Sequence, residues 1–282
     1  MSKIIEWQGH GIDPNAIETL LARVADEIIL PRFGNLSADQ IQTKSSPTDL
    51  VTQVDIEAEA MMRAALGDIA PGIGFIGEEA AACDPSIVRQ IEGKGAFWVL
   101  DPLDGTRNFV HGKEEFGTIL ALVIDGRTEG GWIYAPMEHG CATAIRGRGV
   151  TWNRQKIPAS VPLRDDLGQL VGSRSVGWLN REWADKLTAN LRANTSSRGA
   201  HCSAYAYLNL LRGDSAFGVS SRVHPWDHAA GALMVTEAGG RVEFLDNEQA
   251  YSPLDSADRP LLKVACQESL DEIKRALRGD TN

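Results

Sequence analysis

The 282-residue chain is poor in basic and aromatic residues. It has 28 lysine and arginine residues against 38 aspartate and glutamate residues, a formal net charge of −10 at pH 7, and 6% aromatic residues. A negative protein repels polyanions, so we expect neither nucleic acid nor a membrane surface as a partner, whereas a small phosphorylated substrate is compatible with this charge. The 43% of hydrophobic residues excludes a disordered chain, and the length of 282 residues predicts one large or two closely packed domains.

Signals for membrane insertion, secretion, disulfides and common catalytic motifs are also missing. No apolar run reaches the roughly 18–20 residues that a spanning helix needs, and the first ten residues do not form a signal peptide, so we expect a cytoplasmic protein. The four cysteines are scattered and indicate neither a zinc site nor a disulfide framework. No Walker-type GxxxxGK or GxSxG segment occurs, and Gly147-Arg148-Gly149 fails the GxGxxG fingerprint because Asn153 and Arg154 follow without a helical run. This argues against the corresponding nucleotide sites and hydrolase triad.

Apolar periodicity predicts the elements of the first half of the chain. Helices are expected over 13–34, where Asp13 and Pro14 suit a helix start, and over about 50–66, with the polar stretch 43–48 as a mobile loop. Short apolar runs bounded by turn residues predict strands, the last three of them as an antiparallel meander. These runs are 73–76, 97–100, 118–124, 131–135 and 141–145.

In the second half, strands alternate with helices, which predicts an α/β layer. The expected strands are 170–172, 216–219, 242–245 and 261–265, and the expected helices are 178–191, 202–211, 228–238 and 269–277. We therefore expect an N-terminal α+β part over 1–160 that carries most of the candidate ligands, and a C-terminal α/β part over 161–282 that contributes Asp227.

Three acidic segments lie where predicted elements end or begin: Glu78-Glu79, Asp101-Pro102-Leu103-Asp104, and Trp226-Asp227 just ahead of a helix. A proline between two aspartates disfavours both regular helix and strand, so we expect a turn that directs both carboxylates and the Leu103 carbonyl to one point. Such oxygen ligands suit Mg²⁺ or Mn²⁺. Taken singly, each segment has a simpler interpretation. Glu78 and Glu79 would be a solvated pair, Asp101 and Asp104 turn and cap residues, and Asp227 an N-cap. Together they would need a cation between them.

Gly105 and Thr106 follow Asp104 directly, at what the sequence predicts to be a helix N-terminus. The free backbone N–H groups of a helix N-terminus bind anions. A phosphate site would then adjoin the metal site.

The segments 44–52, 75–79, 98–112, 225–231 and 237–240 stand in an order and spacing that resembles the inositol monophosphatase family. This family is part of the metal-dependent, lithium-sensitive sugar phosphatases, which include the fructose-1,6-bisphosphatases. The resemblance covers about residues 13–277. It implies a layered α-β-α-β-α sandwich, a homodimer, and a phosphomonoesterase that uses Mg²⁺-activated water on a small polyol or sugar phosphate. It also implies two or three Mg²⁺ ions, with Mn²⁺ as a substitute and Li⁺ as an inhibitor.

The resemblance also assigns roles to individual residues. Five ligands would hold the metals: Glu78, Asp101, the Leu103 carbonyl, Asp104 and Asp227. Gly105 and Thr106 would bind the substrate phosphate through their N–H groups, with Asp104 and Asp227 also facing the substrate. Asp55 and Thr106 would orient the attacking water, a role that Glu78 shares. Lys44 would lie in a mobile loop that closes near a weakly bound metal.

One position departs from the family's pattern. The animal inositol enzymes have a glutamate that binds inositol hydroxyls four residues before the histidine of the His-Pro-Trp-Asp segment; counting back from His224 gives Ser220 here. A short hydroxyl cannot make the same charged contact, which argues against myo-inositol 1-phosphate as the dedicated substrate. Histidinol phosphate, fructose 1,6-bisphosphate and adenosine 3′,5′-bisphosphate stay open as substrates, and a regulatory binding protein that retains the fold stays open as an alternative function.

The segment 199–204 also differs from the small-residue run that is common in the family. His201 in this segment would either enter the pocket or serve as a cap or core residue.

Overall fold

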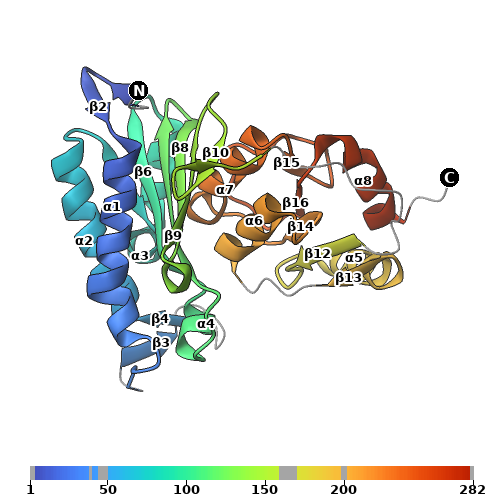
Figure 1. The fold of residues 1–282 in the computed structure, drawn as a ribbon. Helices are drawn as coiled ribbons and strands as arrows, with labels where there is room; N and C mark the ends of the chain where they lie inside the picture. Colours follow the sequence, from blue (N-terminus) through green and yellow to red (C-terminus); the bar gives the residue numbers. More distant parts are fainter. Residues whose placement is uncertain (1–3, 38–39, 44–49, 159–169, 198–201, 280–282) are drawn as a thin grey trace.

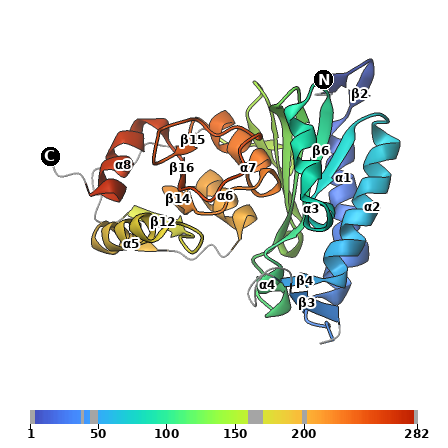
Figure 2. The same ribbon diagram turned by 180° about the vertical axis from the view of Figure 1, so that it is seen from behind.

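The computed structural model describes residues 4–37, 40–43, 50–158, 170–197 and 202–279. Its elements form five layers, with helices outside and between two sheets (Figures 1 and 2). The predicted α-β-α-β-α sandwich is therefore confirmed. Lys44 and His201 lie outside the described residues, and the division of the chain at residue 160 stays a prediction.

The larger sheet has seven strands in the order β11-β10-β9-β8-β7-β6-β5, antiparallel except for the parallel pair β5 and β6. Its strands are β5 (Gly74–Gly77), β6 (Ala96–Asp104), β7 (Gly117–Ile124), β8 (Arg127–Ala135), β9 (Gly140–Ile145), β10 (Val150–Trp152) and β11 (Gln155–Lys156). The expected meander corresponds to β7, β8 and β9 and is confirmed.

Helices α1 (Pro14–Val24) and α2 (Gln53–Ile69) cover the outer face of this sheet (Figure 1). Asp13 caps α1 as expected, because its carboxylate accepts a hydrogen bond from the Asn15 N–H at 3.0 Å. Further helical turns over Ala25–Ile29 and Leu30–Arg32 continue the chain from α1. A short ribbon, β1 (Ile5–Trp7) and β2 (His10–Ile12), precedes α1.

The second helix begins three residues later than predicted. Leu50–Thr52 forms β4, which pairs with β3 (Ile41–Thr43), and α2 starts only after Thr52. Thr52 and Asp55 form a reciprocal capping box: the Thr52 hydroxyl accepts from the first turn of the helix, and the Asp55 carboxylate accepts from the Thr52 N–H. This local cap, rather than the apolar pattern, fixes the start of the helix.

The smaller sheet has five strands in the order β13-β12-β14-β16-β15. They are β12 (Leu170–Arg174), β13 (Thr195–Ser197), β14 (Phe217–Ser220), β15 (Arg241–Phe244) and β16 (Leu261–Val264). Helices α5 (Arg181–Asn194) and α8 (Leu270–Arg278) cover its outer face. The start of α5 was predicted too early, because the side chain of Asn180 accepts from the Trp183 N–H at 3.0 Å and caps the helix there.

Helices α6 (Ser203–Arg212) and α7 (Pro225–Glu237) lie between the two sheets and share a buried apolar cluster with both. The α7 backbone comes close to β8 at Gly131, where a Cβ atom would lie 2.9 Å from the Ala230 Cα atom. Two shorter helices, α3 (Glu78–Cys83) and α4 (Thr106–Val110), follow β5 and β6. Both therefore begin at the carboxyl ends of neighbouring strands, where the acidic segments lie.

Two predicted boundaries near the acidic segments were wrong. Strand β6 continues through the Asp-Pro-Leu-Asp segment to Asp104, because a register shift between Asp101 and Asp104 accommodates the proline within the strand. Helix α7 begins at Pro225, so Asp227 lies inside its first turn and His224 is the N-cap. Proline suits the first helical position, because an N–H group there would have no partner within the helix.

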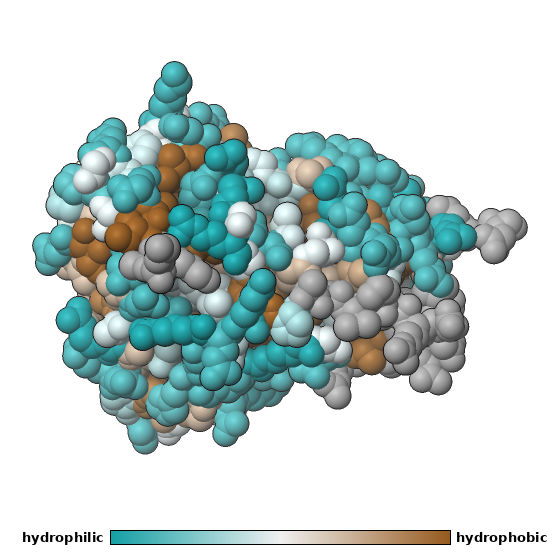
Figure 3. Space-filling view, turned by 45° about the horizontal axis from the view of Figure 1, so that its top comes forward, coloured by the Kyte–Doolittle hydropathy of each residue, from teal (hydrophilic) through white to brown (hydrophobic). Residues whose placement is uncertain are grey.

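Hydrophilic residues cover most of the face drawn in Figure 3, and apolar residues form small groups on it. Among the described residues, no helix is both long and apolar enough to cross a membrane.

We predict opposite effects on stability for two Gly→Ala substitutions. Gly131→Ala places a methyl group against the α7 backbone and should lower the free energy of unfolding by roughly 1–3 kcal/mol. Gly67→Ala lies in α2, where nothing stands within 4 Å of the added Cβ, and should raise the free energy by roughly 0.5–1 kcal/mol. Urea unfolding of both variants measures the difference; equal effects would show that α7 does not pack this closely on the sheet.

Candidate active site

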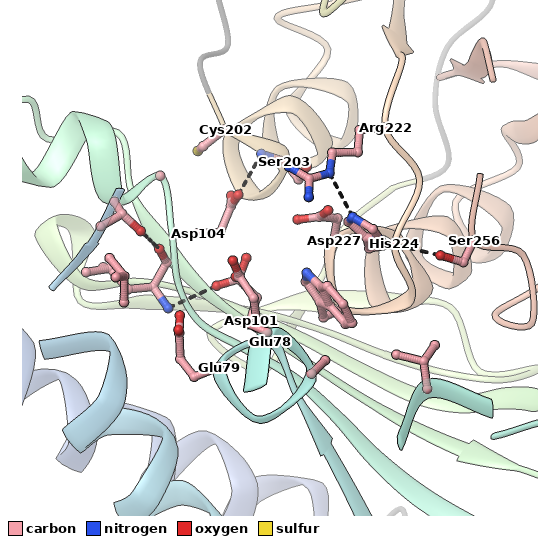
Figure 4. Close-up of a pocket in the computed structure, with 18 of the residues that line it drawn as sticks. Glu78, Glu79, Asp101, Asp104, Cys202, Ser203, Arg222, His224, Asp227 and Ser256 are labelled. Atoms are coloured by element: carbon pink, nitrogen blue, oxygen red, sulfur yellow. Dashed lines mark hydrogen bonds between the residues drawn. The ribbon is translucent and has the colours of Figure 1, made fainter. Parts of the chain in front are cut away.

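A cavity of about 1530 Å³ lies between the carboxyl ends of β5 and β6 and the C-terminal layer. Asp101, Asp104 and Asp227 each offer it one carboxylate oxygen, and these three oxygens lie within 4.8 Å of one another. Glu78 and Glu79 line the same cavity from the start of α3 (Figure 4). The structure thus brings together the three acidic segments, although more than 120 residues separate Asp101 from Asp227 in the sequence.

The irregular end of β6 is held by hydrogen bonds. The Asp101 carboxylate accepts from the Leu103 N–H at 3.0 Å, and the Thr118 hydroxyl donates to the Pro102 carbonyl at 2.9 Å. These contacts fix the backbone between the two aspartates, both of which line the cavity.

Asp104 is anchored by the other half of the molecule. Its carboxylate accepts from the N–H groups of Ser203 at 3.1 Å and Ala204 at 2.5 Å, the first residues of α6. A helix N-terminus carries partial positive charge, so this contact stabilises the ionised form. The prediction did not include this contact, since its partners lie about 100 residues apart.

Glu59 is a second residue that the sequence analysis missed. It projects from α2 and accepts from the N–H groups of Glu79 at 2.8 Å and Ala80 at 2.9 Å, so it caps α3 and holds the glutamates in place. A Cβ atom at Gly77 would stand 2.2 Å from a Glu59 carboxylate oxygen, so a larger residue there would displace the Glu59 side chain from these hydrogen bonds. In the sequence, Glu59 is one more acid on a polar helix face, and nothing local distinguishes it.

Asp55 and Thr106 are in direct contact. The Thr106 hydroxyl lies 2.9 Å from the Asp55 Oδ1 atom and 3.0 Å from the Leu103 carbonyl oxygen, while the N–H and hydroxyl groups of Thr52 donate to Asp55 Oδ2. Burial raises the pKa of Asp55 to about 6 despite these hydrogen bonds. Gly105 precedes Thr106 in the left-handed region, at φ +91°, and is the N-cap of α4.

The acidic cluster has excess negative charge. Burial, then the neighbouring charge of Glu78, raises the pKa of Asp104, and burial followed by the charges of Asp104 and Glu78 raises the pKa of Asp227 well above its usual range. Arg222 and Lys263 lower the pKa of Asp227 but do not cancel these effects. Because all the donors are oxygens and their charges repel, the residues present fit a hard divalent cation.

Ser220 lies at the end of β14 and lines the same cavity. Its hydroxyl accepts a hydrogen bond from the Lys263 ammonium group at 2.7 Å. Lys263, Arg174 and Arg222 also line the cavity. None of them was identified from the sequence, because lysine and arginine side chains are mostly exposed.

The family model described as "Inositol monophosphatase family" matches residues 15–277. The chain belongs to the inositol monophosphatase family. It is 30% identical to the inositol-1-monophosphatase of Bacillus subtilis, over 74% of this chain and 77% of that protein. It is also 30% identical to the fructose-1,6-bisphosphatase/inositol-1-monophosphatase of Thermotoga maritima, over 82% and 84% of the two chains.

Another relative is the Nus factor SuhB of Escherichia coli, with 30% identity over 91% of this chain and 96% of that protein. Among solved structures, a Thermotoga maritima IMPase matches with a TM-score of 0.75 and 26% identity, covering 94% of this chain and 96% of that chain. The fold predicted from the resemblance is therefore confirmed.

We predict that Asp227→Asn removes most of the stabilisation by Mg²⁺. A ligand present at 100 times its Kd adds about 2.7 kcal/mol to the free energy of unfolding, and the variant should lose most of this gain. In EDTA the variant should be at least as stable as the wild type, because it removes one of several repelling charges. Thermal unfolding with and without Mg²⁺ measures both effects. Glu92→Gln, an exposed change of equal charge at the cavity rim, should keep the Mg²⁺ effect; loss in both variants would mean a nonspecific charge effect.

We further predict a pH effect from Asp55 in the metal-free protein. A carboxyl group whose pKa is raised on folding stabilises the protein below its unfolded pKa, near 3.8, and loses that stabilisation as pH rises through about 6. The expected loss is about 3 kcal/mol. Asp55→Asn should flatten the dependence of unfolding free energy on pH between 4 and 6 in EDTA. Asp68→Asn, at an exposed position of the same helix, should retain the wild-type slope; equal slopes in all three proteins would contradict the burial of Asp55.

Proposed function

We propose that this chain is a Mg²⁺-dependent phosphomonoesterase that hydrolyses a small polyol or sugar phosphate. One observation carries the proposal. The Asp101, Asp104 and Asp227 carboxylates lie close together, and Gly105 and Thr106, which follow Asp104 directly, form the N-terminus of α4. A cation site next to an anion site is the arrangement that phosphoryl transfer requires.

The proposed metal ligands are the Glu78, Asp101, Asp104 and Asp227 carboxylates and the Leu103 carbonyl. Mg²⁺ bound there would polarise the phosphoryl oxygens and lower the pKa of a water molecule. The Leu103 carbonyl retains one lone pair beside its hydrogen bond from Thr106. The ammonium and guanidinium groups on the opposite wall do not enter this ligand set.

Gly105 and Thr106 would hold the substrate phosphate with their backbone N–H groups. The chain passes close to its neighbours here: a Cβ atom at Gly105 would lie 3.0 Å from the Cys202 Cβ atom and 3.1 Å from the Glu115 carbonyl oxygen. The glycine therefore allows both the left-handed backbone and the close approach of the C-terminal half.

Thr106 and Asp55 would activate and orient the attacking water. The Thr106 hydroxyl accepts a hydrogen bond from that water and passes its own proton toward the Asp55 carboxylate, 2.9 Å away. With a pKa of about 6, Asp55 is ionised at neutral pH yet basic enough to take up a proton. Glu78 would share in orienting the water from the other side of the site.

The comparisons support the reaction class more strongly than a single substrate. Two of the relatives are named for inositol monophosphate and fructose 1,6-bisphosphate hydrolysis, and another is named a Nus factor. The name Nus factor supports the alternative that this chain is a regulatory binding protein that retains the fold. The homodimer, the cytoplasmic location, the lack of a nucleic-acid or membrane partner, Mn²⁺ substitution and Li⁺ inhibition stay predictions.

We predict phosphate release, with Mg²⁺ and not with EDTA, from at least one of four esters: inositol 1-phosphate, histidinol phosphate, fructose 1,6-bisphosphate and adenosine 3′,5′-bisphosphate. Asp101→Asn should lower the rate at least 100-fold, because it removes a charged ligand, while the circular dichroism spectrum stays unchanged. Absence of metal-dependent release from all four esters, with stoichiometric binding of a macromolecular partner, would favour the regulatory protein instead.

A further inference from the structure

The C-terminal wall of the cavity is rich in cations and hydroxyl groups. The described residues that line it from β12 onward include three basic side chains, Arg174, Arg222 and Lys263, and five serines. The only described acid among them is Asp227, which belongs to the proposed metal site. Beyond that site, the wall therefore offers positive charge and hydrogen-bond donors to a bound molecule.

Lys263 is built into the centre of this wall. It lies on β16 beside Gly218 of β14, which in turn pairs with Ser173 of β12, so the three residues form a row across the sheet. A Cβ atom at Gly218 would come within 2.8 Å of the Ser173 hydroxyl and 3.1 Å of the Lys263 Cε atom. Glycine at this position leaves the space in which the lysine side chain reaches the cavity.

The Lys263 side chain is almost fully buried, with 1% of its surface exposed. Its ammonium group donates to the Ser220 hydroxyl at 2.7 Å and stands 4.8 Å from the centre of the Tyr207 ring. Within the described part of the chain, no ion pair joins it to a carboxylate. An ammonium group has three donors, so a buried lysine with one such neutral partner retains the capacity to bind an anion.

Burying this cation is costly. Desolvation lowers the pKa of Lys263 to about 8, although the charges of Asp227 and Asp104 partly oppose the shift. An apolar residue in the strand would avoid this cost. With divalent cations between the aspartates, the negative charge that supports Lys263 would also be neutralised. A buried ammonium group without such support loses its proton unless another anion lies beside it, and in a cavity that takes a phosphate ester the substrate itself supplies one.

We propose that Lys263 is a specificity-determining residue that binds a second anionic group of the substrate, remote from the phosphate that is cleaved. This inference rests on the proposed phosphatase function. The preferred substrate is then a hydroxylated phosphate ester that carries a carboxylate or a second phosphate. Esters with a distal ammonium group, such as histidinol phosphate, meet a like charge and are disfavoured.

Two matched pairs of esters test this inference and distinguish the two anions. 3-Phosphoglycerate differs from glycerol 3-phosphate by a carboxylate in place of a hydroxymethyl group. Fructose 1,6-bisphosphate differs from fructose 1-phosphate by a second phosphate. We expect kcat/KM for the ester with the additional anion to exceed that of its partner at least tenfold in one pair, at fixed free Mg²⁺.

Lys263→Met removes the charge and leaves an unbranched side chain one atom shorter, and it should reduce that ratio about tenfold, mainly through KM. Arg89→Gln, an equal loss of charge at an exposed position on the opposite wall, should leave the ratio unchanged. A wild-type ratio near one in both pairs overturns the inference and leaves the phosphatase function intact. The inference is also overturned if Lys263→Met alters Mg²⁺ dependence but not the ratio, since the lysine would then serve the metal site. Metal-dependent release from inositol 1-phosphate but from none of the esters in the two pairs overturns this inference alone. Absence of metal-dependent release from the two pairs and from the panel of the proposed function overturns that function and this inference with it.

Discussion

The concentration of negative charge at the junction between the two sheets is the constraint on which the rest of the structure depends. Asp101 and Asp104 come from the end of β6 and Asp227 from α7, and their carboxylates converge although like charges repel. The fold maintains this convergence with fixed dipoles. Amide groups at the start of α6 bind Asp104, and the Glu59 carboxylate binds the amides at the start of α3. A divalent cation would complete the balance of charge.

The same contacts connect the site to the architecture. The Asp104 contact joins the large sheet to the middle helical layer, and the bulged end of β6 sets where α4 begins. The apolar cluster around α6 and α7 supports both sheets. A change in the packing of α7 would therefore alter the position of Asp227 as well as stability. The geometry of the site and the packing of the layers therefore depend on the same contacts.

Local signals in the sequence predicted much of this arrangement. Strand ends followed directly by acids, a proline between two aspartates, and a Gly-Thr helix start each have a local physical meaning, and they identified the acidic segments before their convergence was visible. The capping signals were used incompletely: the Asp13 cap was recognised, but Thr52 and Asn180, which set the starts of α2 and α5, were not. The start of α7 was missed because Pro225 was not recognised as its first residue.

The residues that the sequence did not reveal act through contacts between distant segments. Glu59 binds amides 20 residues away, and Lys263 reaches a serine 43 residues away in the neighbouring strand. Neither residue has an unusual local context. The sequence showed a serine, Ser220, where the resemblance to the animal inositol enzymes implies a glutamate. That Lys263 lies on the adjacent strand could be seen only from the sheet order β14-β16.

The most direct test of the central claim is a titration of the protein with Mn²⁺, in which free Mn²⁺ is followed by electron paramagnetic resonance with and without inorganic phosphate. If the acidic cluster holds a cation beside the anion site of α4, binding is saturable and phosphate tightens it, because two ligands that attract each other must raise each other's affinity. Saturable binding that phosphate leaves unchanged would separate the two sites, and no saturable binding at millimolar Mn²⁺ would contradict the presence of a cation site in the acidic cluster.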